Sequence, residues 1–284
     1  MEKLSIILRT VCPDRPGLVS ELTTWISDNG GNIKHSDHHT DQDAGLFLCR
    51  IEWNRNDSLI NKKEIFDQFQ EIGLAINGKF NINFSDEVPN VAIFVSKQNH
   101  CLIDLLWRVR NGELKMNVPL IISNHPDLEN IAKDFKAQFV CIDSTNSSKS
   151  SVEKQILNLL KDFDIELVVL AKYMQILSEN FLQSYSSIIN IHHSFLPAFK
   201  GAQPYHRAWN RGVKLIGATA HYVTQDLDEG PIIEQCTVKV SHRDEVDDLI
   251  RKGRDIERIA LSRAVRLHLN HQVFVYNRKT AVFD

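Results

Sequence analysis

Long hydrophobic runs are missing from this sequence. No stretch reaches the roughly 20 apolar residues that a membrane-spanning helix needs, and the apolar residues 4–8 are too few for a secretory signal. The net charge of −3 provides no field that would favour nucleic acid or an acidic membrane surface. These absences predict a cytoplasmic protein whose partners are neither membranes nor nucleic acids.

The cysteine and glycine patterns exclude several kinds of site. The five cysteines are scattered, and no pair has the Cys-x-x-Cys spacing of a metal knuckle or a dithiol redox motif. The first strand of the larger region, at residues 91–95, is followed neither by the Gly-x-Gly-x-x-Gly loop of dinucleotide enzymes nor by a Walker-type loop. We therefore expect no metal and no bound cofactor.

Residues 1–84 have the pattern of a small sheet with helices on one face. Strand-like and helical segments follow one another in the order βαββαβ, with strands at 4–9, 32–40, 46–53 and 79–84 and helices over 18–26 and 65–76. This order predicts a ferredoxin-like unit. Residues 85–89 are polar and end in proline, which predicts a linker between two domains.

Residues 90–284 change to an alternation of strands and helices. Four short runs are apolar on both faces, at 91–95, 118–122, 139–142 and 167–170. Such runs are typical of a Rossmann-like, mostly parallel sheet that helices cover on both sides. Two later segments, 218–223 and 231–235, predict an antiparallel extension of this sheet. The fold is therefore predicted to be α/β, with a second domain over residues 90–284.

Asn190 and His192 end a further apolar run in this second domain. Side chains two residues apart on a strand share a face, and the carboxyl ends of strands are where open α/β sheets bind ligands. An amide donor beside an imidazole suits a reaction that passes through an oxyanion. A strand end with satisfied polar groups explains the same pattern equally well. Asp228, in a turn between two strand-like segments, would favour chemistry if its carboxylate reached His192.

The turn Asp14-Arg15-Pro16-Gly17-Leu18-Val19, within the βαββαβ order, resembles an ACT domain. The turn residues alone favour a tight turn with no ligand. The resemblance implies a regulatory domain that pairs between subunits, so we expect a homo-oligomer, either a dimer or a tetramer. It also implies an amino-acid effector site at Asp14, Arg15 and Gly17.

Several segments of the second domain resemble the folate-dependent formyltransferase family over about residues 90–270. They are Asn190-Ile191-His192, Ser194 to Pro197, His221 to Thr224 and Leu227 to Pro231. The resemblance implies that Asn190, His192 and Asp228 form the catalytic trio. It also implies a folate pocket formed by the loop residues Met174, Gln175, Ile176 and Leu177 together with Val223 and Thr224. Without the resemblance, core packing would be the better explanation for the apolar loop residues.

The sequence leaves the transferase pattern at two places. Family members that formylate a phosphorylated amine have a glycine-rich phosphate loop after the first strand, whereas Ser96 to Cys101 contains no glycine. His193 replaces the proline that commonly follows the catalytic histidine. With the ACT resemblance, these departures imply hydrolysis of 10-formyltetrahydrofolate to formate and tetrahydrofolate, which supplies formate for purine synthesis and balances one-carbon folate pools. We expect His100 and His193 to shape the folate-facing pocket where an amine acceptor would otherwise lie.

Three alternatives stay open at this point. The first is a formyltransferase that uses the same trio on an amine acceptor. The second is a metal-dependent hydrolase using His192, His193, His206 and His221, which is disfavoured because neighbouring residues on a strand point to opposite faces. The third is a non-catalytic amino-acid sensor in which the N-terminal domain carries the function.

Overall fold

The computed structural model describes residues 4–54, 61–142, 148–198 and 204–284. The chain divides into two compact units, one ending at Val88 and one running from Pro89 to Val282. Phe283 and Asp284 group with the first unit, whereas the sequence analysis placed them in the second domain. Among the described residues, no helix combines the length and apolar character that a membrane span requires.

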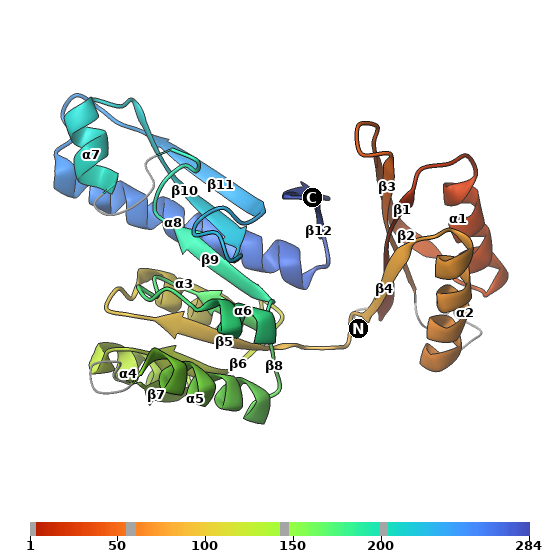
Figure 1. Cartoon of the computed structure of the whole chain (residues 1–284), viewed down its shortest axis with the longest axis horizontal. Helices are drawn as coiled ribbons and strands as arrows, with labels where there is room; N and C mark the ends of the chain where they lie inside the picture. The colour runs from red at the N-terminus through yellow and green to blue at the C-terminus, as the bar shows by residue number, and fades with distance from the viewer. Residues whose placement is uncertain (1–3, 55–60, 143–147, 199–203) are drawn as a thin grey trace. The chain divides into compact units, whose positions relative to one another are not determined.

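The first unit is an antiparallel sheet of four strands with two helices. Its elements are β1 (Ser5–Pro13), α1 (Leu18–Asp28), β2 (Ile33–Asp41), β3 (Leu46–Asn54), α2 (Lys62–Ala75) and β4 (Lys79–Phe84). This succession along the chain confirms the predicted order βαββαβ, and the strands lie in the sheet in the order β2-β3-β1-β4 (Figure 1).

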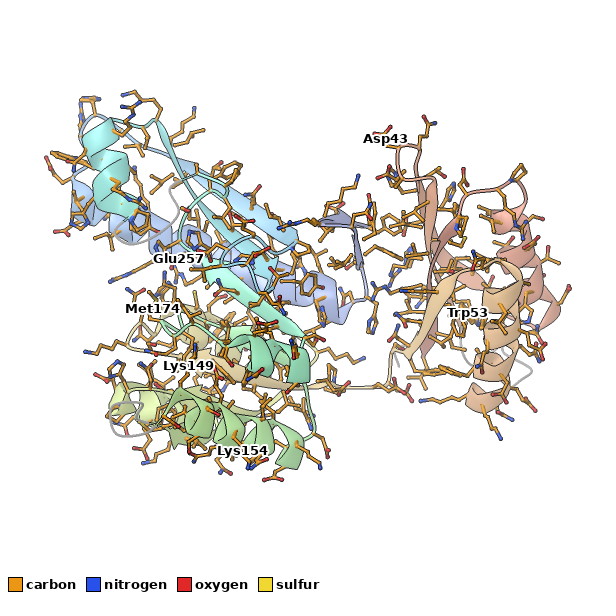
Figure 2. The ribbon with its side chains drawn as sticks, viewed as in Figure 1. Asp43, Trp53, Lys149, Lys154, Met174 and Glu257 are labelled. Atoms are coloured by element: carbon orange, nitrogen blue, oxygen red, sulfur yellow. The ribbon has the colours of Figure 1, made fainter. Side chains whose placement is uncertain are left out.

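The core of this unit forms where the helices meet the sheet. Leu18, Leu22 and Ile26 recur every four residues, so α1 presents them all on one face, and all three are buried. Trp53 of β3, labelled in Figure 2, is also fully buried. Its ring lies 6.5 Å from that of Trp25 in an edge-on arrangement. The buried residues of α1 therefore have the spacing of an amphipathic helix.

The second unit is built on a sheet of seven strands in the order β11-β10-β9-β8-β5-β6-β7. The strands are β5 (Asn90–Val95), β6 (Asn117–Ser123), β7 (Gln138–Cys141), β8 (Ile165–Leu170), β9 (Ile188–His192), β10 (Leu215–Tyr222) and β11 (Ile232–Lys239). Strands β5 to β9 are parallel, and β10 and β11 add the predicted antiparallel extension (Figure 1). A short hairpin follows, formed by β12 (Val273–Tyr276) and β13 (Lys279–Val282).

Helices cover both faces of this sheet. They are α3 (His100–Arg110), α4 (Glu129–Asp134), α5 (Lys149–Asp162), α6 (Glu179–Ser184), α7 (Pro204–Arg211) and α8 (Val246–Leu269). Alternate residues of β5 point to opposite faces. Val91, Ile93 and Val95 join a core with α3 and α8, whereas Ala92 and Phe94 join a core with α5 and α6. This double burial explains why β5 is apolar throughout.

Candidate active site

The carboxyl end of β9 carries Asn190 and His192, and β10 runs antiparallel beside it. In this register His221 lies opposite Asn190, and Thr219 lies opposite His192. Directly paired residues of neighbouring strands share a face. The side chain of His192 is buried, with 5% of the residue exposed. The strand pairing thus adds a second histidine, His221, to the two residues that the sequence placed together.

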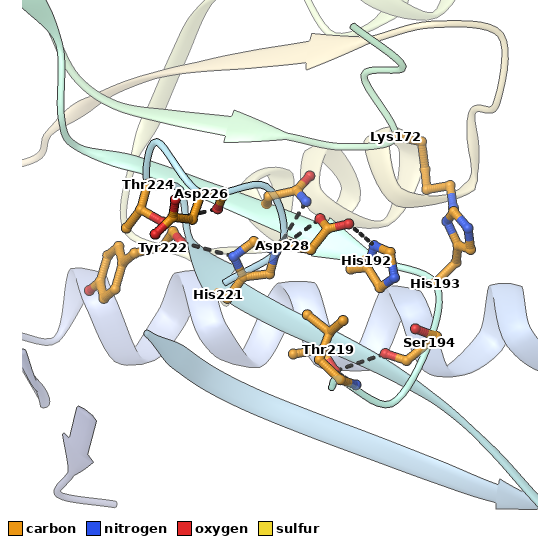
Figure 3. Close-up of polar contacts among 12 residues, drawn as sticks. Lys172, His192, His193, Ser194, Thr219, His221, Tyr222, Thr224, Asp226 and Asp228 are labelled. Carbon is orange, nitrogen blue, oxygen red and sulfur yellow. Dashed lines mark hydrogen bonds and ion pairs between the residues drawn. The ribbon is translucent and has the colours of Figure 1, made fainter. Parts of the chain in front are cut away.

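Asp228 lies in the turn between β10 and β11, with a left-handed φ of 57°. Its Oδ2 lies 3.3 Å from His192 Nδ1, and its Oδ1 lies 3.7 Å from His221 Nε2 (Figure 3). The turn passes so close to β10 that a Cβ on Gly230 would lie 1.7 Å from the carbonyl oxygen of Tyr222. Glycine is therefore required at position 230 for Asp228 to reach both rings.

The environment of Asp228 strongly favours its ionised form. The hydrogen bond from His192, with the ring of His221 nearby, holds the pKa of this carboxyl well below its usual range and outweighs the opposing effect of burial. The side chain is only 13% exposed, so solvent screens these interactions weakly. Near neutral pH the site therefore holds a carboxylate between two imidazoles, which is suited to stabilising a protonated ring.

His192 presents only one of its ring nitrogens to this carboxylate. Nδ1 faces Asp228, whereas Nε2 is buried and has no hydrogen-bond partner among the described residues. The nitrogen placed to exchange a proton with Asp228 is therefore Nδ1.

His221 connects Asn190 to Asp228, and the sequence analysis missed this role. Its Nδ1 donates a hydrogen bond of 2.8 Å to the backbone carbonyl of Tyr222, so its Nε2 is directed toward the site. That nitrogen lies 3.3 Å from Asn190 Nδ2. An amide carries two N–H groups, so one can contact His221 while the other is available to an oxygen of the substrate. The cross-strand register with Asn190, which only the structure provides, identifies His221.

The segment after His192 is held by a buried polar network. Thr219 Oγ1 donates to the Ser194 carbonyl at 2.8 Å and accepts from the Leu196 N–H at 3.1 Å. Gln235 of β11 donates to the Leu196 carbonyl at 3.0 Å. Because buried hydrogen bonds of this kind are costly to break, the antiparallel extension holds the chain that leaves β9.

A cavity of about 510 Å³ opens beside His193. Its wall includes Met174 and Gln175 from the predicted folate loop, together with Lys172 and Glu257. Met174 and Glu257 are both labelled in Figure 2. A cavity of this size is in the range of small-molecule sites.

The predicted folate residues differ in their surroundings. Met174 and Ile176 are each 63% exposed, so the core-packing explanation is wrong for these two side chains. Leu177 and Val223 are partly buried against the core beside α5, and Thr224 is exposed. Of the six residues, the structure brings Met174 and Gln175 to the described cavity wall, whereas Ile176, Leu177, Val223 and Thr224 lie outside it.

A buried ionic cluster lies behind this cavity and was also missed. Glu257 of α8 is 1% exposed and accepts hydrogen bonds from His100 Nε2 at 2.6 Å and from the Tyr205 hydroxyl at 2.9 Å. Lys172 Nζ lies 3.2 Å from its Oε1. Burial raises the pKa of Glu257, but the hydrogen bond from His100 and the charge of Lys172 outweigh it and lower the pKa to about 2. His100 thus contacts Glu257 behind the cavity and is not among the residues that line the described wall.

We expect this cluster to make the protein sensitive to acid. Because the folded-state pKa of Glu257 is lowered from 4.5 to about 2, its contribution to stability is complete above pH 4.5 and is lost as the pH falls toward 2. The shift corresponds to roughly 3 kcal/mol. Thermal unfolding between pH 7 and pH 3 should show a stability difference between the wild type and Glu257→Gln that narrows on acidification. A difference that stays constant with pH would contradict this assignment.

His100, Cys101 and Glu257 bring their ligand atoms within 4.8 Å of one another, which raises the question of a cation. The Lys172 ammonium already contacts Glu257, and burial raises the pKa of the Cys101 thiol, which favours its protonated form. A thiol must lose its proton to bind a metal. This donor set therefore fits a metal poorly.

His192 and His193 do not point to opposite faces, contrary to the geometric argument made from the sequence. Strand β9 ends at His192, so His193 lies outside the strand alternation. The two rings stack instead, with centroids 4.8 Å apart and planes inclined by 20°. His206, the third member of the metal alternative, is exposed on α7.

The predicted effector turn of the first unit is an ordered helix start. Gly17 adopts a φ of 90° and forms the N-cap of α1. Arg15 forms two hydrogen bonds with Glu21, at 2.9 and 2.8 Å, and the Asp14 N–H donates to the Gly45 carbonyl at 3.0 Å. These contacts explain the turn itself, and an effector role for Asp14, Arg15 and Gly17 stays a prediction.

The sheet of the second unit, with Asn190, His192 and Asp228 gathered at the end of β9, defines a formyl transferase domain, and a family model of that description matches residues 89–265. An ACT domain model matches residues 6–57. The chain belongs to the formyltetrahydrofolate deformylase family. A formyltetrahydrofolate deformylase from Synechocystis sp. is 54% identical over 283 residues, covering 100% of both chains.

Solved structures agree with this assignment. The crystal structure of a formyltetrahydrofolate deformylase from Pseudomonas syringae pv. tomato has a TM-score of 0.97 and 38% identity, covering 100% of this chain and 96% of that one. Glycinamide ribonucleotide transformylase 1 from Symbiobacterium toebii has a TM-score of 0.66 and 30% identity, covering 72% of this chain and 98% of that one. The likeness to the deformylase therefore extends over more of the chain than the likeness to the transformylase.

Proposed function

We propose that this chain hydrolyses 10-formyltetrahydrofolate to formate and tetrahydrofolate. Water adds to the formyl carbon, the bond between that carbon and N10 breaks, and N10 takes a proton. The observation that carries the proposal is the ionised Asp228 between His192 and His221, beside the Asn190 amide. This arrangement offers an oxyanion donor, a protonatable ring and a carboxylate within one site.

Each member of the trio has a distinct role in this proposal. Asn190 donates an N–H to the formyl oxygen as that oxygen gains negative charge. His192, when it carries protons on both ring nitrogens with its Nδ1–H toward Asp228, adds positive charge near the oxyanion. Asp228 positions the attacking water, stabilises the protonated His192 and relays a proton to N10. His221 orients the Asn190 amide through its contact of 3.3 Å.

Water, and not an amine, is the proposed acceptor because of the segment after β5. This segment contains no glycine, and His100 at the start of α3 is engaged with Glu257. Glycine-free segments do not readily let successive backbone N–H groups approach a phosphate. The segment after β5 would therefore not bind the phosphate of a phosphorylated amine as a glycine-rich loop does.

The proposal predicts formate release without any amine. The purified chain, incubated with 10-formyltetrahydrofolate alone, should produce formate and tetrahydrofolate in equal amounts. Adding glycinamide or a phosphorylated glycinamide should leave the rate of tetrahydrofolate formation unchanged, since neither competes with water. Strict dependence of turnover on an added amine would favour the formyltransferase alternative.

We also predict a binding role for the exposed apolar residues of the folate loop. Changing Met174 and Ile176 together to serine should raise the KM for 10-formyltetrahydrofolate about tenfold, because each loses apolar surface that the ligand would cover. The kcat should change little. Leu74→Ser is a matched control, since Leu74 is 79% exposed on α2 in the other unit. An unchanged KM in the double variant would mean that the folate does not cover these two side chains.

The proposed reaction consumes only water besides the folate, so we propose that it needs no cofactor. The ACT domain model over residues 6–57 supports a regulatory role for the first unit. A homo-oligomer, an amino-acid effector at the Asp14 to Gly17 turn and a cytoplasmic location stay predictions for this chain.

A further inference from the structure

Lys172 combines two features that are unfavourable for a lysine. It follows β8 with a left-handed φ of 66°, a conformation uncommon for residues other than glycine. Its side chain is only 6% exposed, although burying an ammonium group costs free energy. Local strain of this kind persists where the surrounding structure determines it, and it is frequent at functional sites.

The ammonium of Lys172 has two polar neighbours. Its Nζ lies 3.2 Å from Glu257 Oε1 and 3.2 Å from His193 Nδ1. Figure 3 shows the side chain of Lys172 reaching the ring of His193, which lies beside His192. Because Glu257 is a carboxylate held by His100 and Tyr205, it stabilises the charged form of the lysine.

The contact with Lys172 determines the tautomer of His193. An ammonium group has only donors, so the ring nitrogen that faces it must supply a lone pair. His193 is therefore neutral, with its proton on Nε2. Protonating Nδ1 would place two donors against each other and break the hydrogen bond to Lys172.

The groups around His193 also disfavour a charge on this ring. Lys172 faces it from the end of β8, His192 from β9 and Tyr205 from α7, and α8 contributes Glu257 and Arg254 to the same cavity wall. Lys97, His125 and His206 line the cavity as well. Glu257 is the one acidic residue in the described wall, and it is already paired with Lys172.

We infer that Lys172 is a positioning residue for hydrolysis: its ammonium keeps His193 neutral, so that of the two stacked rings only His192 gains a proton. This inference rests on the function proposed above. Two charged rings with centroids 4.8 Å apart would repel each other, whereas a neutral His193 supports a protonated His192 against Asp228. Lys172 thus acts on catalysis through His193.

A kinetic test compares Lys172→Met with the wild type. We expect kcat to fall on the order of 30-fold with a KM for 10-formyltetrahydrofolate within threefold, since the contacts to folate are retained. The basic limb of the kcat profile should move to lower pH by about one unit, because His193 then competes for the proton. Lys154→Met, on the exposed side of α5, is the matched control. An unchanged kcat and pH profile would overturn the inference.

Two double variants separate this role from simple charge balance. Lys172→Met with Glu257→Gln removes both buried charges, so we expect its Tm to return toward the wild-type value while kcat stays low. Recovery of kcat together with Tm would mean that Lys172 only neutralises Glu257, and the inference would fail.

In a His193→Asn protein, Lys172→Met should change kcat by less than about threefold, because the two residues act in series. If Lys172→Met lowered kcat as much in the His193→Asn protein as in the wild type, the two residues would act independently, which would contradict the inference.

A spectroscopic test does not depend on turnover. In histidine-labelled protein, long-range ¹⁵N–¹H spectra should show His193 as the neutral Nε2–H tautomer from about pH 6 to 8. An Nδ1–H tautomer or a doubly protonated ring would overturn the inference even if the protein releases formate. If the wild type does not release formate, the proposed function is wrong. The tautomer of His193 is measured independently of that result.

Discussion

Replacing Asp228 with asparagine should lower kcat for formate release by roughly 10²–10⁴. The substitution keeps the size of the side chain but removes the negative charge that His192 and His221 share. Without this charge, a protonated His192 loses its partner, and the water and the N10 proton lose their positioning group. The measurement is the steady-state rate of tetrahydrofolate formation near neutral pH.

Asp226→Asn is the matched control for this prediction. Asp226 lies in the same turn, but its side chain is 66% exposed and pairs with Arg278 at the surface. Exposed ion pairs contribute little to stability, so the control should keep its turnover and its Tm. Near-native turnover in Asp228→Asn would mean that the carboxylate has no part in the chemistry.

Replacing His192 with asparagine should produce a loss of similar size, roughly 10²–10⁴ in kcat. The ring is 5% exposed and its Nδ1 lies 3.3 Å from Asp228, so asparagine fills part of its volume but cannot carry the proton. The KM for the folate should change much less than kcat, because His192 acts on the formyl group. His242→Asn, at an exposed position after β11, is the control.

Combining the two substitutions tests whether His192 and Asp228 act as a unit. Groups that act together in one step give losses that are far from additive. The protein with both changes should therefore be little slower than the slower single variant. A loss equal to the product of the two single losses would indicate that the residues act in separate steps.

The sequence was sufficient for the fold because its periodicities were clear. Val91 to Val95 is apolar throughout since β5 is buried on both faces, and that pattern indicated a parallel sheet. Asn190 and His192 were identifiable because their spacing of two places them on one face of β9. Met174 and Ile176 were harder to interpret, since exposed apolar residues resemble core residues in a sequence.

Lys172, His221 and Glu257 could not be assigned from the sequence for a physical reason. His221 depends on the register between β9 and β10, which no local pattern specifies. Lys172 and Glu257 are 85 positions apart and meet only because α8 packs against β9, β10 and β11. The stacking of His193 on His192 depends on where β9 ends, and strand boundaries are poorly determined by periodicity.

The most direct test of hydrolysis at this site is turnover in ¹⁸O-labelled water without any amine. Mass spectrometry of the formate should show one ¹⁸O per molecule, formed at the rate at which tetrahydrofolate appears, and both rates should fall together in Asp228→Asn. The account would be contradicted if the wild type formed no labelled formate. It would also be contradicted if Asp228→Asn formed labelled formate at the same rate as the wild type.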